Sequence, residues 1–284
     1  MTNQPELEFT GERFTPECVR EIAYEHWHRY AWAAQMVKGK RVLDAACGEG
    51  YGSYMLSREA AHVTAVDLDQ AAIDHAMRRY TAENIQFRQA DCTRLPLDDA
   101  SVDVVVSFET LEHLAEQDQL LGEFRRVLCP DGFLLISSPD KKTYSDQTGY
   151  DNPFHVRELY RDEFEGLLKR HFPAFRLFGQ KLMFVSTVWS MDGSGQCESL
   201  LTDGEDLKAG PRPQLPPLYF LAVAAASEQY LPTTRAVSLF GDREESVYQH
   251  YNDEVRKHIR AGKLLAERDA EIERLRGLLE QSGQ

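Results

Sequence analysis

The residues best suited to hold a cofactor lie where an apolar segment, residues 41–46, meets a glycine-rich stretch, residues 48–52. Alternating glycines favour a tight turn between a strand and a helix. Asp44 and Glu49 add carboxylates to this turn, where a pyrophosphate would need positive potential. Asp67 ends the next apolar run, about 20 residues on, as expected of a carboxylate that accepts hydrogen bonds from ribose hydroxyls. These features predict a cofactor with a ribose and a cationic amine but no phosphate, namely S-adenosylmethionine.

Alternating strand and helix signals surround this turn. They predict strands over 41–46, 62–66, 84–88, 102–107 and 132–138, and helices over 51–58, 70–80 and 116–128. Such alternation indicates an α/β fold with a parallel, doubly wound sheet, whose ligands gather at the carboxyl ends of the strands. An amphipathic helix over 22–37 is expected across the cofactor mouth. The pattern continues with a helix over 157–171 and apolar strands over 175–187 and 218–225.

Five ordered segments resemble the core of the class I S-adenosylmethionine-dependent methyltransferases. They are 42–52, 65–69, 89–92, 103–114 (DVVVSFETLEHL) and 126–139 (RVLCPDGFLLISSP). The resemblance implies a Rossmann-like, seven-stranded sheet, parallel with one antiparallel strand near the edge, with helices on both faces and a C-terminal helical extension. The flanking segments 9–14 (FTGERF), 25–30 (EHWHRY) and 152–158 (NPFHVRE) are similar to bacterial type 11 methyltransferases associated with glycan and O-antigen assembly.

The first group of expected cofactor contacts lies at the ends of two strands. Gly48 and Gly50 would let the backbone approach the methionine part of the cofactor, and Asp44 would hold its ammonium group directly or through a water. A plain turn is the alternative for the glycines. Asp67 would accept hydrogen bonds from the ribose hydroxyls, and Leu68 would pack against the adenine.

Further cofactor contacts are expected from the later segments and from the N-terminal helix. By resemblance, Asp91 would accept from the adenine amine and Cys92 would donate its backbone N–H, although Asp91 could instead cap a helix or turn. Phe108 directly follows the strand over 102–107 and would lie under the sulfonium. Arg29 is a candidate partner of the cofactor carboxylate, because a buried carboxylate favours a bidentate partner.

His155 is the first candidate for a catalytic base. A hydroxyl acceptor must lose its proton, and imidazole titrates near working pH. The alternative is a turn or helix entry in which His155 caps or packs. Glu109 and His113 are four residues apart and would share one face of the turn after the fourth strand, where they orient the substrate or hold each other. No spacing typical of a metal site is recognised.

The composition narrows the range of partners. The formal net charge of −14 repels phosphate backbones and anionic membranes, which disfavours a nucleic-acid substrate. Five cysteines without a C-x-x-C pair suit a reduced, cytoplasmic protein. No apolar run approaches the roughly 18 residues of a membrane span, and no secretory signal is recognised. A soluble protein with a small-molecule or glycan acceptor is expected.

Three regions are predicted along the chain. Residues 1–40 form an N-terminal cap-helix region, residues 41–226 a methyltransferase domain with an insertion over 191–217, and residues 227–284 a charged helical segment. The insertion is rich in Gly, Ser, Asp and Pro and is either a substrate-side element or a surface loop. The final segment carries an apolar stripe with spacings of three and four residues. This stripe is typical of a helix packed on its own domain or of a short coiled coil that forms a homodimer or contacts a partner.

Together these features predict an enzyme that moves a methyl group from S-adenosylmethionine to a small-molecule or glycan acceptor, preferably to a hydroxyl oxygen of a sugar or polysaccharide. The alternative among enzymes is N- or C-methylation of a natural product, quinone or amino sugar. A second alternative is a cofactor-binding scaffold without transfer activity that recruits a glycan-assembly partner through its C-terminal helix.

Overall fold

The fold is seen in a computed structural model, which describes residues 15, 21–193, 197–202, 204 and 206–283. The flanking segment 9–14, which contributes to the family resemblance, lies outside the described residues. The chain divides into two compact units, Met1–Leu239 and Phe240–Gln284. Each unit is described by itself.

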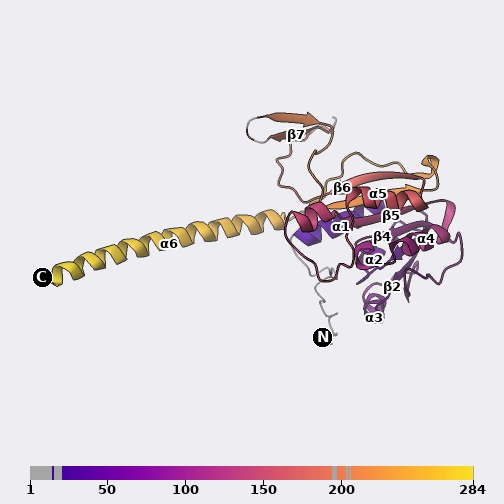
Figure 1. Ribbon diagram of the computed structural model, residues 1–284, viewed down its shortest axis with the longest axis horizontal. Helices are drawn as coiled ribbons and strands as arrows, with labels where there is room; N and C mark the ends of the chain where they lie inside the picture. The colour runs from indigo at the N-terminus through magenta and orange to yellow at the C-terminus, as the bar shows by residue number, and fades with distance from the viewer. Residues whose placement is uncertain (1–14, 16–20, 194–196, 203, 205, 284) are drawn as a thin grey trace. The chain divides into compact units, whose positions relative to one another are not determined.

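The first unit is built on a seven-stranded sheet (Figure 1). Its strands are β1 (Arg41–Ala45), β2 (His62–Asp67), β3 (Ile85–Gln89), β4 (Val102–Ser107), β5 (Leu128–Pro139), β6 (Ala174–Gln180) and β9 (Tyr219–Ala225). Their order is β3-β2-β1-β4-β5-β9-β6. Pairing is parallel from β3 to β5, whereas β9 runs antiparallel to both β5 and β6. The predicted sheet, parallel with one antiparallel strand near the edge, is therefore confirmed.

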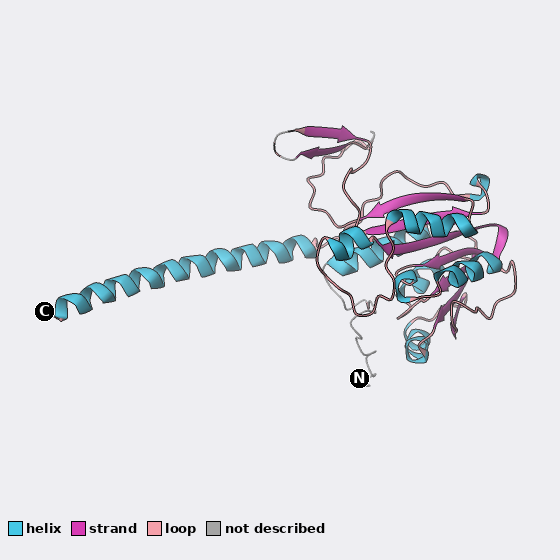
Figure 2. Cartoon of the chain, viewed as in Figure 1, coloured by secondary structure: helices cyan, strands magenta, loops and turns pink. Residues whose placement is uncertain are grey.

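Helices cover both faces of the sheet (Figure 2). They are α1 (Glu21–Ala34), α2 (Tyr51–Ser57), α3 (Gln70–Arg79), α4 (Gln117–Val127) and α5 (Arg161–His171). Successive residues of β1 point to opposite faces, so Val42 joins the hydrophobic core that contains Leu56 of α2, and Leu43 joins the one that contains Phe124 of α4. On the same criterion, α1 and α3 pack on the face of the sheet that α2 covers, and α5 packs on the face that α4 covers. Burial on both faces explains why the inner strands β4 and β9 are largely apolar in sequence, whereas the edge strand β3 carries polar residues.

Two element boundaries differ from those predicted. β5 begins at Leu128 rather than at 132, because Leu128 pairs with Val102 across a register shift that keeps the Cys-Pro-Asp-Gly segment in the strand. α5 begins at Arg161 rather than at 157, because the Glu163 side chain accepts a hydrogen bond from the Tyr160 N–H over 3.0 Å and caps the helix there. In both cases a contact between residues of the folded chain sets the residue at which the element begins.

The predicted insertion contains a small hairpin. Its strands, β7 (Ser199–Thr202) and β8 (Leu207–Gly210), pair antiparallel. β6 ends at Gln180 rather than at 187, so the apolar residues that follow it are outside the sheet. Among them Val188 and Trp189 are 96% and 70% exposed. An apolar sequence is thus not sufficient to extend this edge strand.

The second unit contains the long helix α6 (Ser246–Ser282), which spans 37 residues. It carries the predicted apolar stripe, of which Val255, Ile259, Leu265 and Leu279 are exposed. Across the part of the chain that the structure describes, no helix combines the length and the apolar character needed to cross a bilayer.

Candidate active site

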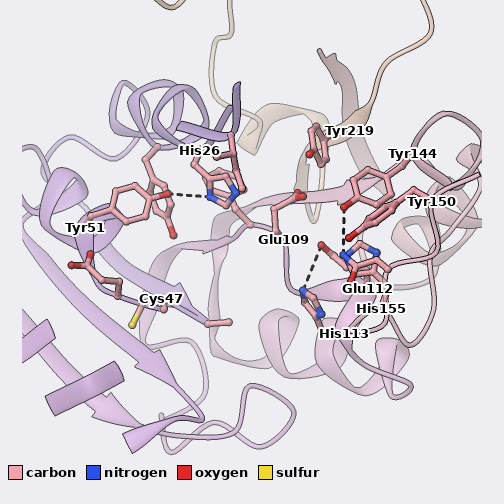
Figure 3. A pocket seen from close by; sticks show the side chains of 17 residues that line it. His26, Cys47, Tyr51, Glu109, Glu112, His113, Tyr144, Tyr150, His155 and Tyr219 are labelled. Carbon is pink, nitrogen blue, oxygen red and sulfur yellow. Dashed lines mark hydrogen bonds and ion pairs between the residues drawn. The ribbon is translucent and has the colours of Figure 1, made fainter. Parts of the chain in front are cut away.

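A cavity of about 280 Å³ opens where β1 and β4 end, at the sheet edge predicted to bind ligands. Figure 3 shows His26 and Tyr51 at one side of it, Tyr144 and His155 at the other, and Glu109 between them. The lining comes from α1, from the turns after β1 and β4, from the segment between β5 and α5, and from the start of β9. It comprises Ile22, His26, Tyr30, Ala46, Cys47, Gly48, Glu49, Tyr51, Phe108, Glu109, Glu112, His113, Tyr144, Tyr150, Asn152, His155 and Tyr219.

The glycine-rich turn after β1 forms one wall of the cavity. The Gly48 N–H donates to Asp67 Oδ2 over 2.8 Å, which ties the end of β2 to the turn. Gly50 precedes α2 with a φ of 95°, a conformation that costs glycine little. A methyl group at Gly52 would lie 2.1 Å from the Tyr30 ring, so α2 can approach α1 this closely only with glycine here. The conformation of the turn and the position of α2 are therefore set by packing and hydrogen bonding within the protein.

Asp44 lies behind this wall and does not line the cavity. Its fully buried carboxylate accepts hydrogen bonds from Ser53 Oγ over 2.6 Å and from the Tyr30 hydroxyl over 3.1 Å. Burial is the main reason that the pKa of Asp44 rises to about 7. The structure thus gives Asp44 a role in positioning Tyr30, which does line the cavity.

Side chains in and directly after α3 compensate part of the negative charge of Glu49. The Tyr80 hydroxyl donates to it over 2.8 Å, and Arg79 Nη1 and His75 Nε2 each lie 3.1 Å from its Oε1. Burial raises the pKa of Glu49, and these partners oppose that shift. The turn therefore carries less negative charge than the sequence suggests, and electrostatics at this point alone does not exclude a phosphate.

The expected ribose and adenine contacts follow β2 and β3. Leu68 is 69% exposed, and its carbonyl accepts from Gln89 Nε2 over 2.9 Å. Asp91 Oδ1 accepts from the Thr93 N–H over 2.8 Å and from the Thr93 hydroxyl over 2.7 Å, so this oxygen caps a turn. Cys92 is buried, which raises the pKa of its thiol to about 12. None of these side chains belongs to the cavity lining.

Arg29 of α1 is fully buried against two residues of the lining. Its Nη1 donates to Gln180 Oε1 over 2.8 Å and lies 3.9 Å from Glu109 Oε1, and its guanidinium lies 4.9 Å above the Tyr219 ring. Among the described residues, Nε and Nη2 of Arg29 have no hydrogen-bond partner. Buried donors without partners are costly, and a carboxylate would satisfy both, but Arg29 itself does not belong to the cavity lining.

Phe108 and Glu109 follow β4 and face the cavity. The Phe108 ring meets the Tyr30 ring edge-on at 5.2 Å. Glu109 has a φ of 52°, its N–H donates to Ser137 Oγ over 3.0 Å, and Ser137 Oγ donates to Glu109 Oε1 over 2.6 Å. This left-handed residue interrupts the helical spacing that was expected between Glu109 and His113.

His155 lies in a polar network on the opposite wall. Its Nδ1 is 2.6 Å from Glu158 Oε1, and Ser145 Oγ donates to the other oxygen of Glu158. The Phe154 N–H donates to Asn152 Oδ1 over 3.1 Å, which leaves Asn152 Nδ2 to donate to His155 Nε2 over 3.0 Å. The proton of the neutral imidazole is thus on Nδ1 and the lone pair on Nε2. Glu158 was not predicted, although its spacing of three residues from His155 was an available signal.

Three tyrosines form an aromatic wall beside His155. Tyr144, in the π-helical turn η2 (Lys142–Asp146), stacks on the His155 ring at 5.3 Å. Tyr150 and Tyr219 lie 6.1 and 6.0 Å from Tyr144 between ring centroids. None of the three was predicted, because they come from a loop and from a distant strand.

The structure also gathers three potential metal ligands. Glu112, His113 and His155 present ligand atoms that lie within 4.8 Å of one another, and all three line the cavity. Glu112 and His113 belong to the 3-10 turn η1 (Leu111–His113). Sequence spacing did not reveal this group, because His155 is far along the chain from the other two.

Comparison with known proteins agrees with this architecture. Residues 43–136 match the family described as Methyltransferase domain. A Mycobacterium tuberculosis protein named Probable S-adenosylmethionine-dependent methyltransferase Rv3030 is 42% identical over 167 residues, covering 57% of this chain and 60% of the relative. A Mycolicibacterium smegmatis protein named in the same way is 41% identical over 168 residues, covering 57% and 64%. The chain thus spans between 60% and 64% of the length of these curated relatives.

A solved structure shows the same fold. The YcgJ protein from Bacillus subtilis aligns with a TM-score of 0.51 at 18% identity, covering 70% of this chain and 99% of that one. The strand order, the antiparallel strand β9 and the match over residues 43–136 lead to one conclusion. Residues 43–136 thus match a methyltransferase domain, and the sheet around them has the fold of class I methyltransferases.

Proposed function

We propose that the protein is an S-adenosylmethionine-dependent methyltransferase that acts on a hydroxyl group of a small molecule or glycan. The observation that carries this proposal is a cavity lined by the glycine-rich turn on one side and by His155 on the other. A methyl donor at the turn and an acceptor at His155 would share one space. The family match and the names of the two mycobacterial relatives support methyl transfer.

The cofactor would be held by the ends of β1, β2 and β3 and by α1. Asp67 would accept the ribose hydroxyls, the exposed Leu68 would pack against the adenine, and the second oxygen of Asp91 would accept from the adenine amine beside the Cys92 N–H. The two unused donors of Arg29 would meet the cofactor carboxylate. When bound, the cofactor supplies an electrophilic methyl group on a sulfonium.

The turn and the fourth strand would position the reacting end of the cofactor. Gly48, which lines the cavity, would leave room for the methionine part, and Phe108 would supply an aromatic surface beneath the sulfonium. Gly50 does not line the cavity, and a methyl group there would lie 2.7 Å from Ala76, so it would act by letting α3 pack against the turn. Asp44 would act on the ammonium through Tyr30 rather than by direct contact, because it lies behind the cavity wall.

His155 would take the proton of a hydroxyl acceptor. Its Nε2 carries the lone pair, and Glu158 at Nδ1 would stabilise the imidazolium that forms. Before this step, the hydrogen bond from the Asn152 amide to Nε2 must be replaced by one from the acceptor hydroxyl. An amine acceptor attacks through its own lone pair and would not need this step. The pH dependence of transfer therefore bears on the acceptor class.

Two measurements on the full chain test this function. Isothermal titration calorimetry with S-adenosylmethionine and its demethylated product measures cofactor binding, and labelled-methyl uptake by a panel of sugars, glycans, quinones and amines identifies the acceptor. Binding with transfer to a hydroxyl compound supports the proposal. Transfer to nitrogen or carbon favours the alternative acceptors, and binding without transfer favours the scaffold. Binding of NAD instead of S-adenosylmethionine would refute the proposal.

We also propose that α6 pairs with α6 of a second copy of the chain. The exposed residues Val255, Ile259, Leu265 and Leu279 supply an apolar stripe, and pairing would bury it. Sedimentation of the full chain and of a chain that ends at Gly241 tests this assembly. A dimer that becomes a monomer on truncation is expected, and an unchanged number of protomers would contradict it.

A further inference from the structure

We propose that Glu112, His113 and His155 bind a divalent transition-metal ion on the acceptor side of the cavity (Figure 3). Two imidazoles and one carboxylate are a donor set that suits first-row divalent ions such as Mn²⁺ and Zn²⁺. The inference concerns the same cavity as the proposed function and deepens it. Ion binding can nevertheless be measured without any methyl transfer.

Hydrogen bonds orient both histidines for coordination through Nε2. His113 Nδ1 lies 3.0 Å from the Phe154 carbonyl oxygen, which can only accept, so the ring proton is on Nδ1. His155 Nδ1 lies 2.6 Å from the Glu158 carboxylate, which selects the same tautomer. Histidines that ligate metals generally donate their other ring N–H to a carbonyl or carboxylate in this way. Both rings therefore have the outer partner that a metal ligand needs.

The spacing of the donor atoms is close to that of a loaded site. His113 Nε2 and Glu112 Oε1 face each other at 4.0 Å, which is too long for a hydrogen bond. Donor atoms around one ion with bonds of about 2.0–2.2 Å lie about 3 to 4 Å apart. Donor atoms that lie within 4.8 Å of one another would approach by roughly 1 to 2 Å to bind one ion. The side chain of Glu112 is 1% exposed, and an ion would offset the cost of burying its charge.

Backbone contacts hold the two donor segments together. The Glu112 carbonyl accepts from the Val156 N–H over 2.8 Å, which joins η1 to the segment that carries His155. The rings of His113 and His155 meet edge-on at 5.1 Å. Coordination by His155 requires the Asn152 amide to release Nε2. The donors are thus positioned by the fold, and one side chain has to move.

A three-ligand site has consequences for the proposed chemistry. Three protein ligands leave coordination positions that a water or an acceptor hydroxyl can occupy from the cavity. The ion would lower the pKa of that hydroxyl, so that its proton passes to solvent water before the oxygen attacks. His155 then acts as a ligand, and its role as a base belongs to the metal-free protein.

The test is a metal titration of the full chain after treatment with EDTA and dialysis. Free Mn²⁺ is followed by electron paramagnetic resonance, and Co²⁺ binding by its visible d–d absorption. We expect one ion per chain. His113→Ala, His155→Ala and Glu112→Gln should each weaken binding by at least about tenfold. His258→Ala, which removes an exposed histidine of α6, should leave binding unchanged.

Two control measurements accompany the metal titration. Circular dichroism and thermal unfolding show whether each variant is folded. In the unmutated protein, Mn²⁺ should selectively broaden the imidazole resonances of His113 and His155. No bound ion in the unmutated chain, or equal binding by all folded variants, would overturn the inference. If Mn²⁺ binds and S-adenosylmethionine does not, the ion site stands and the proposed function fails; if only S-adenosylmethionine binds, the reverse holds.

Discussion

Replacement of Asp44 by Asn tests the electrostatics beneath the glycine-rich turn. Burial raises the pKa of this carboxyl from 3.8 to about 7, against the hydrogen bonds from Ser53 and Tyr30 that favour its ionised form. Between these two values the folded chain keeps a proton that the unfolded chain has released. The folded state therefore loses stability as pH rises from about 4 to about 7. The Asn side chain does not titrate, so the free energy of unfolding of D44N does not include this pH-dependent loss.

The size of the effect follows from the two titration curves. One pKa unit corresponds to about 1.36 kcal/mol, and integration between pH 5 and pH 8 gives a loss of about 2.5 kcal/mol for Asp44. The free energy of unfolding of D44N should thus rise by about 2.5 kcal/mol relative to the unmutated chain over this range. Burial also raises the pKa of Glu25 to about 7, but Glu25 is present in both proteins and its contribution cancels.

Urea unfolding at pH 5, 6, 7 and 8, followed by circular dichroism, measures this difference. The matched control is Asp131→Asn, which removes an exposed carboxyl of β5 and should show no comparable trend. Any fixed cost of the Asn amide beside two hydroxyl donors shifts all four points equally. A difference between D44N and the unmutated chain that stays constant from pH 5 to pH 8 would refute the raised pKa.

Three further substitutions test the turn, the cofactor contact and the base. Gly52→Ala should cost about 3 kcal/mol or more, because its methyl group would overlap the Tyr30 ring, whereas Gly166→Ala, with open space around its Cβ, should be neutral or stabilising in thermal unfolding. Asp67→Asn should weaken S-adenosylmethionine binding about tenfold or more in calorimetry, and unaltered affinity would remove Asp67 from the ribose site. His155→Ala should lower transfer to a hydroxyl acceptor ~10²-fold in metal-free protein without changing cofactor affinity, and undiminished transfer would exclude it as the base.

The sheet was predictable because its strands are buried on both faces. Val42 and Leu43 of β1 enter different hydrophobic cores, so consecutive residues of this strand are apolar, and this is visible in the sequence. Edge elements lack that signal. The hairpin of β7 and β8 carries exposed apolar residues such as Leu200 and Leu207, and their pattern does not distinguish a hairpin from a loop.

The site was predictable only where a residue follows a strand directly. Asp67 ends β2 and meets the turn after β1 because parallel strands end at one edge. The partners of Glu109 and His155 were not predictable in the same way. Ser137 reaches Glu109 from the neighbouring strand, and the positive φ of Glu109 has no signature in its residue type. Such contacts depend on how distant segments pack.

The π-helical turn η2 makes the shape of the aromatic wall depend on chain length. The Gln147 N–H donates to the Lys142 carbonyl over 3.1 Å, a bond that spans five residues where an α-helix spans four. Removal of one residue from this turn would restore α-helical spacing and rotate the side chains beyond it by about 100° around the helix axis. Tyr144 or its replacement would then face away from His155. A single deletion would thus change the wall of the cavity beside His155 and leave the glycine-rich turn in place.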